Sequence, residues 1–212
     1  MGNIYDITIP MHSDMPAFPG DEKVFEIYDI LKVEQGDAYT IRKIKLLTHT
    51  GTHIDAPSHF IPHGRTLDQL DLSKFTGKAM VVKINNQEKV SIDEVGDLQI
   101  EPDIIILFKT RNSQIWKENK NFEEKYVYVT PETAQFLVEK KVKAVGIDYL
   151  SIDKYGEEVK PLVHLKLLEN DIPIIEGLNL SEVSEGLYRF TCLPLKMIGV
   201  DGSPARAILE DL

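Results

Sequence analysis

Four of the six histidines in this chain lie in one short segment that begins at His49 and ends at His63. From position 49 to 59 the segment reads HTGTHIDAPSH. An extended chain would hold the backbones of His49 and His53 about 13 Å apart, and Thr-Gly-Thr is a poor helix interior. A bend at Gly51 would fold the chain back, and a short extended piece would present His53 and Asp55 on one face. The segment therefore predicts a local fold in which His49, His53 and Asp55 converge.

Imidazole and carboxylate groups are natural ligands for zinc and for other divalent ions. Apolar neighbours, Leu46, Leu47 and Ile54, indicate that the segment is partly buried. The alternative is a solvated loop, because histidines also cluster by chance on surfaces. We interpret the segment as a site for one or two ions, with zinc expected and manganese or another divalent ion compatible with the same ligands.

Short apolar segments dominate the chain and predict strands. Apolar and polar or small residues alternate from Tyr5 to Ile9 and stop at Pro10, which predicts a first strand. Further strands are expected at 25–30, 39–47, 79–84, 104–108, 144–147, 172–175, 190–198 and 205–209. The segment at 15–21 is rich in turn-forming residues.

Fewer segments predict helices. Ser91 and Glu94 have the spacing of a capping box, and Thr130 followed by a proline predicts a helix that ends near Lys141. A third helix is expected from Pro161 to Glu169. Together the elements predict a mixed α/β, strand-rich domain with a barrel-like β core, and the length is compatible with one domain over residues 1–212.

Composition restricts the partners and the compartment. A formal net charge of −10 argues against nucleic acid or anionic membrane as the main partner, and no apolar run approaches the roughly 20 residues of a membrane span. The single cysteine, Cys192, excludes an internal disulfide and a Cys-x-x-Cys site. The first ten residues do not resemble a signal peptide. A lone cysteine also favours a reducing compartment, so we expect a cytoplasmic protein.

The pattern His-x-Gly-Thr-His-x-Asp-x-Pro-x-His at 49–59 resembles the motif of the cyclase family of metal-dependent hydrolases. That family includes bacterial kynurenine formamidase (arylformamidase) and isatin hydrolase. The letters FPGD at 18–21, and DGSP at 201–204 with Arg206, resemble two further stretches of the family, so the resemblance covers nearly the whole chain. It implies a swivelling β/β/α fold that assembles as a homodimer or homotetramer.

The resemblance also implies a ligand set. His49, His53 and Asp55 would hold a first ion, and Asp55 would bridge to a second ion held by His164 and Glu176. Glu176 ends an apolar run, where an unpaired carboxylate is costly. His164 lies on the apolar face of its expected helix, and a hydrogen-bonded core histidine is the alternative there.

By the same resemblance, His59 would be the proton shuttle, a task that suits the pKa of imidazole near neutral pH. Phe18 is a candidate substrate-binding wall by aromatic stacking, with core packing as the alternative; the family often carries tryptophan at that position. The reaction implied is hydrolysis of an amide or formamide C–N bond, as in N-formylkynurenine to kynurenine and formate.

Several functional alternatives stay open. Within the family they are hydrolysis of a cyclic amide, as in isatin, or an isomerisation or dehydration. From another class, the chain could bind a metal or small molecule without turnover, in which case it would not need His59. The sequence has no Gly-x-Ser-x-Gly elbow, so it gives no support to a serine hydrolase.

Overall fold

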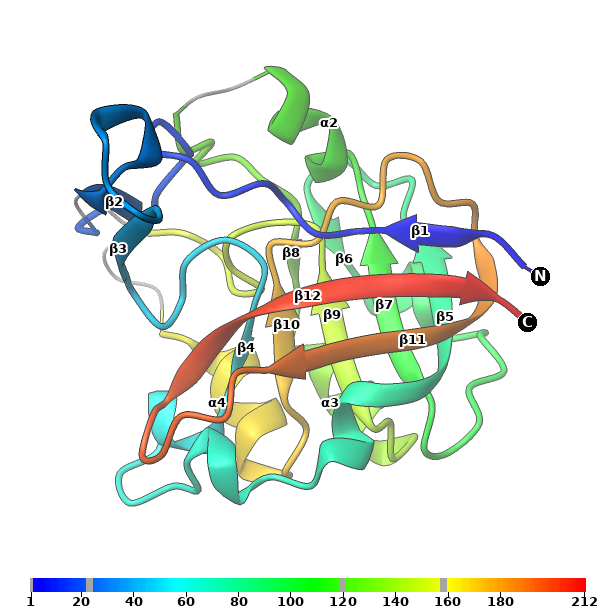
Figure 1. The fold of residues 1–212 in the computed structure, drawn as a ribbon. Coiled ribbons are helices and arrows are strands. Elements are labelled where there is room, and N and C mark those ends of the chain that lie inside the picture. Colours follow the sequence, from blue (N-terminus) through cyan, green and yellow to red (C-terminus); the bar gives the residue numbers. More distant parts are fainter. Residues whose placement is uncertain (1, 22–24, 119–120, 157–159) are drawn as a thin grey trace.

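The computed structural model describes residues 2–21, 25–118, 121–156 and 160–212 (Figure 1). Seven strands close into a β-barrel in the order β12-β11-β5-β7-β9-β10-β4, because β4 pairs back onto β12. Their bounds are β4 (His53–Asp55), β5 (Thr76–Lys83), β7 (Ile105–Lys109), β9 (Ala144–Ile147), β10 (Ile174–Glu176), β11 (Gly186–Pro194) and β12 (Gly202–Asp211). The prediction of a mixed α/β, strand-rich fold with a barrel-like core is confirmed.

The long strand β12 joins the two ends of the chain to the barrel. Along one edge, its residues 202–204 pair with β4 and its residues 208–210 pair with β1 (Ile4–Asp6). Its other edge pairs with β11. On its far side β4 pairs with β10, so the short histidine-containing strand is held between two neighbours.

The central strands of the barrel are covered by a hydrophobic core on each face. Strands β5, β7, β9 and β10 run parallel to one another. Along β7, Ile105 and Leu107 belong to the core inside the barrel, whereas Ile106 and Phe108 belong to the core that includes helix residues. Because both faces are covered, the strand is apolar throughout instead of alternating.

All the described α-helices except the second contribute to the core on the outer face of these parallel strands. The helices are α1 (Ile92–Val95), α2 (Asn112–Glu118), α3 (Pro131–Glu139) and α4 (Leu162–Glu169). Leu137 of α3 and Leu167 of α4 lie in the same core as Val145 of β9. None of the described helices is long and apolar enough to cross a membrane.

Of the two helix starts predicted from capping patterns, one is observed with its cap and the other without it. Thr130 caps α3 by accepting a hydrogen bond from the Thr133 amide at 3.3 Å, as predicted. The capping box expected at Ser91 is wrong, although α1 does begin after it: the Ser91 side chain makes no cap bond, and Glu94 accepts bonds from the amides of residues 85 and 86. The Glu94 carboxylate therefore bonds the loop before β6 (Lys89–Val90) instead of the start of its own helix.

Other differences concern strand length and position. The strand predicted to start at Tyr5 is shorter and covers Ile4–Asp6, with Thr8 in an isolated bridge to Leu178. The strand predicted at 190–198 lies at Gly186–Pro194, because the chain turns before β12. Helix α2 and the two-residue strands β6 (Lys89–Val90) and β8 (Tyr128–Val129) were not predicted, since such short elements have little periodicity.

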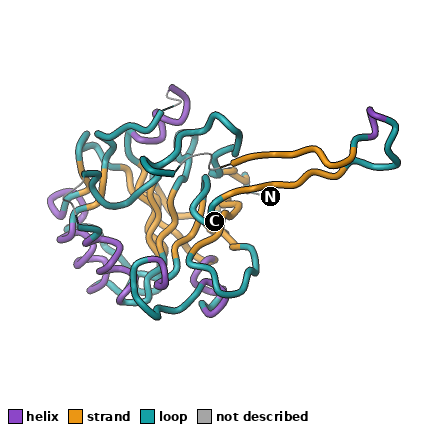
Figure 2. The backbone as a smooth tube through the Cα atoms, turned by 90° about the vertical axis from the view of Figure 1, so that its left-hand side faces the viewer, coloured by secondary structure: helices purple, strands orange, loops and turns teal. Residues whose placement is uncertain are grey.

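One element lies outside the barrel. Strands β2 (Phe25–Leu31) and β3 (Ile41–Leu46) form an antiparallel hairpin that extends away from the body of the molecule (Figure 2). Both strands were predicted within two residues of their observed bounds. The end of β3 leads directly into the histidine-rich segment.

Candidate metal centre and active site

The histidine-rich segment folds through the bend predicted at Gly51, whose φ is +69°. The His53 ring contacts the Gly51 carbonyl through Nδ1 at 2.9 Å. The Thr52 hydroxyl accepts a bond from the Ile9 amide at 2.9 Å and donates to the Gly177 carbonyl at 2.5 Å. Thr52 therefore ties the segment to the chain that follows β1 and to the residue that follows β10.

Position 177 requires a glycine, because its backbone lies against the bend at Gly51. Gly177 has a φ of +68°, and a Cβ built on it would collide with the Gly51 carbonyl oxygen. We expect Gly177→Ala to lower the free energy of unfolding by more than the roughly 1–3 kcal/mol of backbone strain, because the clash adds to it. Urea unfolding measures the loss.

A matched control separates strain from clash. Gly199 has a similar φ of +76°, but nothing lies within 4 Å of the position that a Cβ would take there. Gly199→Ala should therefore show the strain cost alone. Equal losses in the two variants would contradict a tight contact between Gly177 and the histidine-rich segment.

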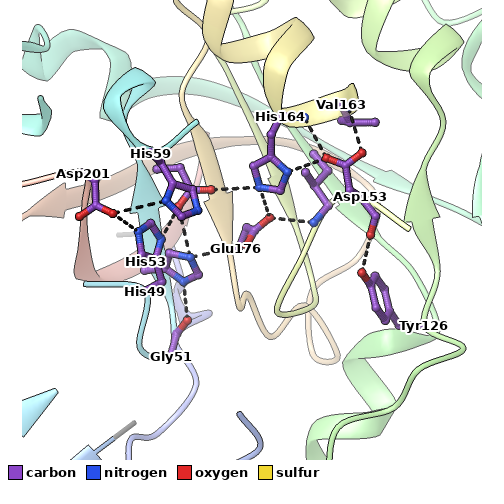
Figure 3. A network of polar contacts seen from close by, with 12 residues as sticks. His49, Gly51, His53, His59, Tyr126, Asp153, Val163, His164, Glu176 and Asp201 are labelled. Atoms are coloured by element: carbon purple, nitrogen blue, oxygen red, sulfur yellow. Dashed lines mark hydrogen bonds and ion pairs between the residues drawn. The ribbon is translucent and has the colours of Figure 1, made fainter. Parts of the chain in front are cut away.

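Two buried carboxylates and two buried histidines form the centre of the cluster (Figure 3). His53 Nε2 lies 3.3 Å from Asp55 Oδ1 and 3.5 Å from Glu176 Oε2. His164 Nε2 lies 3.4 Å from Asp55 Oδ2 and 3.2 Å from Glu176 Oε1. The structure thus brings residues more than 100 positions apart into one site, because β4 and β10 are paired and α4 precedes β10.

His49 and His59 extend this cluster toward the surface. His49 contacts Asp55 Oδ1 through Nδ1 at 2.8 Å and Asp201 Oδ2 through Nε2 at 2.9 Å. The His59 ring stacks on His49 with centroids 3.9 Å apart, and its Nδ1 lies 3.3 Å from Asp201 Oδ2. Asp201 therefore contacts both rings.

Asp55 belongs to both groups of potential metal ligands among the described residues. One group is His53, Asp55 and Glu176, and the other is His49, Asp55 and His59; within each group the ligand atoms lie within 4.8 Å of one another. Asp55 is thus the residue common to both groups, and its role as a bridge stays a prediction. These groups differ from the ligand sets that the resemblance implies: His53 is grouped with Glu176 instead of His49, and His49 is grouped with His59.

The charge balance of the cluster fits a cation. Buried Asp55 Oδ2 makes no hydrogen bond among the described atoms and has only the 3.4 Å contact with His164 Nε2, and a buried oxygen without a hydrogen bond is unusual in a protein interior. Burial and the nearby charge of Asp55 raise the pKa of Glu176. Burial would raise the pKa of Asp55 too, but the surrounding imidazoles of His164, His49 and His53 hold it well below its usual range. A bound divalent ion would neutralise both carboxylates and give Oδ2 a partner.

Burial and the neighbouring carboxylates also shift the pKa values of His49 and His59. Burial disfavours protonated His49, but its contacts with Asp55 and Asp201 outweigh burial and raise its pKa to about 9. Burial lowers the pKa of His59. The two stacked rings therefore differ in proton affinity, and burial favours the neutral form of His59.

Asp153 orients His164 from behind. Its Oδ2 lies 2.6 Å from His164 Nδ1 and accepts a bond from the His164 amide at 3.0 Å, while Oδ1 accepts from the Val163 amide at 3.0 Å. This contact turns His164 Nε2 toward Asp55 and Glu176. Sequence analysis missed Asp153; its position after the buried parallel strand β9 was the available signal, because site residues gather where such strands end.

We expect Asp153→Asn to weaken metal binding by roughly 10- to 100-fold, because the amide no longer fixes the ring nitrogen that faces the carboxylates. Competition with a chromophoric chelator measures this affinity. Asp148→Asn is the control, since Asp148 is also buried but accepts hydrogen bonds from Thr110 and Ser113. Equal losses of affinity in both variants would contradict an orienting role.

A pocket of about 430 Å³ lies over the cluster and is lined by His49, His53, His59, His164 and Glu176. Its size is in the range of small-molecule sites. Aromatic and aliphatic lining residues are Phe18, Phe60, Leu47 and Leu150.

Phe18 both lines this pocket and packs against other aromatic residues. Its ring makes edge contacts with Phe122 and Tyr155, at centroid distances of 5.2 and 5.7 Å. Phe18 can therefore form part of the pocket wall and also pack against neighbouring aromatic residues, so the two interpretations of this residue do not exclude each other.

The remaining histidines and the cysteine lie apart from the pocket lining. His12 and His63 are exposed. Cys192 is buried inside the barrel, and burial raises the pKa of its thiol. The thiol is therefore a core group and is unsuited to act as a nucleophile at neutral pH.

Solved structures share this arrangement of the chain. A protein described as a potential metal-dependent hydrolase with cyclase activity superimposes with a TM-score of 0.86 at 31% identity, over 100% of this chain and 99% of that one. Isatin hydrolase A from Ralstonia solanacearum superimposes with a TM-score of 0.84 over 99% of this chain and 92% of that one, but at 22% identity, which shows a common fold alone.

Sequence comparisons give the family. Kynurenine formamidase of Geobacillus thermodenitrificans is 35% identical over 98% of this chain and 97% of that protein. Cyclase-like protein 3 of Oryza sativa subsp. japonica is 36% identical over 98% of this chain and 80% of that protein. The family model described as putative cyclase matches residues 5–154. The chain therefore belongs to the cyclase family.

Proposed function

We propose that this protein is a metal-dependent hydrolase that cleaves an amide or formamide C–N bond in a small molecule, as an arylformamidase does. The observation that carries the proposal is Asp55: it is shared by two groups of potential ligands, whose histidines and glutamate line a pocket. Relatives named kynurenine formamidase and metal-dependent hydrolase support the reaction class.

The proposed ligands are His49, His53 and Asp55 for one ion, with His164 and Glu176 joining Asp55 at a second. Zinc suits imidazole and carboxylate ligands, and manganese is the alternative. A divalent ion supplies Lewis acidity, which activates water and polarises a carbonyl group.

His59 is the proposed proton shuttle. Its Nδ1 contacts Asp201, which leaves Nε2 for proton exchange in the pocket. Because burial lowers the pKa of the ring and favours its neutral form, Nε2 can accept a proton from water as the C–N bond is attacked and return it to the leaving nitrogen. Water is thereby consumed, and a carboxylic acid and an amine are released.

The pocket favours a substrate with an aromatic ring. Phe18 and Phe60 line it beside apolar Leu47 and Leu150, and aromatic rings pack well against such walls. An aryl formamide such as N-formylkynurenine is therefore our first candidate. A cyclic aryl amide is the second, because isatin hydrolases share the fold.

Initial rates on a panel of substrates test this assignment. Metal-loaded protein should hydrolyse N-formylkynurenine faster than isatin and faster than an aliphatic formamide. Faster turnover of isatin would transfer the assignment to cyclic amides. Stoichiometric binding without turnover of any of them would favour a binding protein.

We also infer that residues 1–212 form one domain, since strands from both ends of the chain pair in one sheet. A homodimer or homotetramer is the proposed assembly.

A further inference from the structure

The segment 151–153, Ser-Ile-Asp, contacts both of the proposed ligands that lie outside the histidine-rich segment. It follows β9, and its Asp153 orients His164 as described above. A second contact reaches Glu176, because the Ile152 amide donates a hydrogen bond to Glu176 Oε1 at 2.7 Å. One short segment therefore directs a histidine of α4 and a carboxylate of β10.

Glu176 and His164 depend on this segment together. The Glu176 oxygen that accepts the amide also lies 3.2 Å from His164 Nε2, and both side chains are buried. Metal affinity depends on residues that orient the ligands, so a shift of the segment 151–153 would misplace both ligands at once. His49 is oriented by a different residue, Asp201, which lies directly before β12.

Tyr126 holds the segment 151–153 from behind. Its hydroxyl donates a hydrogen bond to the Asp153 carbonyl (Figure 3), and the Ser151 side chain hydrogen-bonds the same hydroxyl. Burial raises the pKa of this hydroxyl, so the group stays protonated and remains a donor. Tyr126 therefore bonds the residues on both sides of Ile152, whose amide reaches Glu176.

Aromatic neighbours pack around the ring of Tyr126. The ring stacks on Tyr149 with centroids 4.5 Å apart and makes an edge contact with Phe122 at 5.8 Å. Phe122 in turn makes an edge contact with Phe18 of the pocket wall at 5.2 Å. A phenylalanine at position 126 can keep these ring contacts and lose the hydroxyl alone, which isolates its contribution.

We propose that Tyr126 is a positioning residue for Glu176 and His164 and acts on them through the segment 151–153. The inference rests on the proposed metal site and goes beyond it, because it states which ion depends on Tyr126. Removing the hydroxyl should weaken the ion held by Glu176 and His164 and spare an ion held by His49. A buried tyrosine that contributed to stability alone would not distinguish between two ions.

Titration of metal-free Tyr126→Phe with Zn²⁺, in competition with a chromophoric chelator, tests the inference. Glu176→Gln, titrated in the same way, identifies the relevant ion as the binding step that this variant abolishes. We expect that step to weaken roughly 10-fold in Tyr126→Phe, the lower end of the range for residues that orient ligands, and any other step to keep its wild-type affinity. With Co²⁺ in place of Zn²⁺, the visible absorption of that step should change as well, because it reports the coordination geometry.

Tyr149→Phe is the matched control. Tyr149 belongs to the same aromatic cluster, but its hydroxyl accepts a hydrogen bond from the Glu123 amide at 2.6 Å, so its removal leaves the bonds of Tyr126 intact. Both variants lose one hydroxyl from the cluster, and urea unfolding of the metal-free proteins should show comparable losses of stability. Only Tyr126→Phe should lose Zn²⁺ affinity.

Three results would overturn the role of Tyr126: wild-type Zn²⁺ affinity in Tyr126→Phe, an equal loss in Tyr149→Phe, or an equal weakening of two binding steps. A Glu176→Gln variant that keeps every step would remove Glu176 from the ligands and overturn the inference as well. Wild-type protein that takes up no Zn²⁺ would instead contradict the proposed metal site itself, and the inference with it.

Discussion

Replacing His59 by alanine should lower kcat by roughly 10²–10⁴-fold, the usual contribution of a positioned general acid–base group. Metal content should stay at the wild-type level, because Asp55, Glu176, His53 and His164 remain in contact without His59. KM should change little, since the proton transfer is needed in the transition state and not for binding. Steady-state kinetics with metal analysis on the same preparation measure all three quantities.

His63→Ala is the matched control, because this nearby histidine is exposed and does not line the pocket. It should keep wild-type kcat. Activity that survives in His59→Ala would remove the proton shuttle from this residue. Loss of metal in that variant would instead make His59 a ligand, in agreement with its place beside His49 and Asp55.

Replacing Asp55 by asparagine should have the largest effect on metal binding. Asp55 is the one residue common to both ligand groups found among the described residues, so its charge is needed for either ion. We expect the bound metal to fall below roughly one tenth of the wild-type stoichiometry, because the remaining ligands leave a cation uncompensated in a buried site. Activity should fall with it. Elemental analysis after dialysis against a weak chelator measures the loss.

Glu176→Gln provides the comparison, because Glu176 belongs to only one of the two groups. If two ions bind in the wild type, this variant should retain one of them. Retention of the full wild-type metal content in Asp55→Asn would contradict a bridging role for Asp55.

The local geometry of the site could be predicted from the sequence because it depends on neighbouring residues. A glycine between two threonines permits the observed bend at Gly51, and the two-residue spacing of His53 and Asp55 places both on one side of β4. Apolar patterning likewise predicted most barrel strands. These features follow from φ preferences and from the alternation of side chains along a strand.

Long-range contacts could not be derived in this way. Asp153 and Asp201 reach His164 and His49 only because β9, β10, β4 and β12 are neighbours in a closed barrel. The family resemblance supplied His164 and Glu176, whereas it gave no role to the two aspartates. Glu94 shows the same limit on a smaller scale, because a loop folds over it and replaces the expected cap.

The most direct test of the proposed function is turnover of N-formylkynurenine by protein of known metal content, before chelation, after chelation and after zinc is restored. Activity should disappear when the metal is removed and return when zinc is added. Activity that persists in metal-free protein, or a protein that contains no metal and takes none up, would contradict a metal-dependent hydrolase.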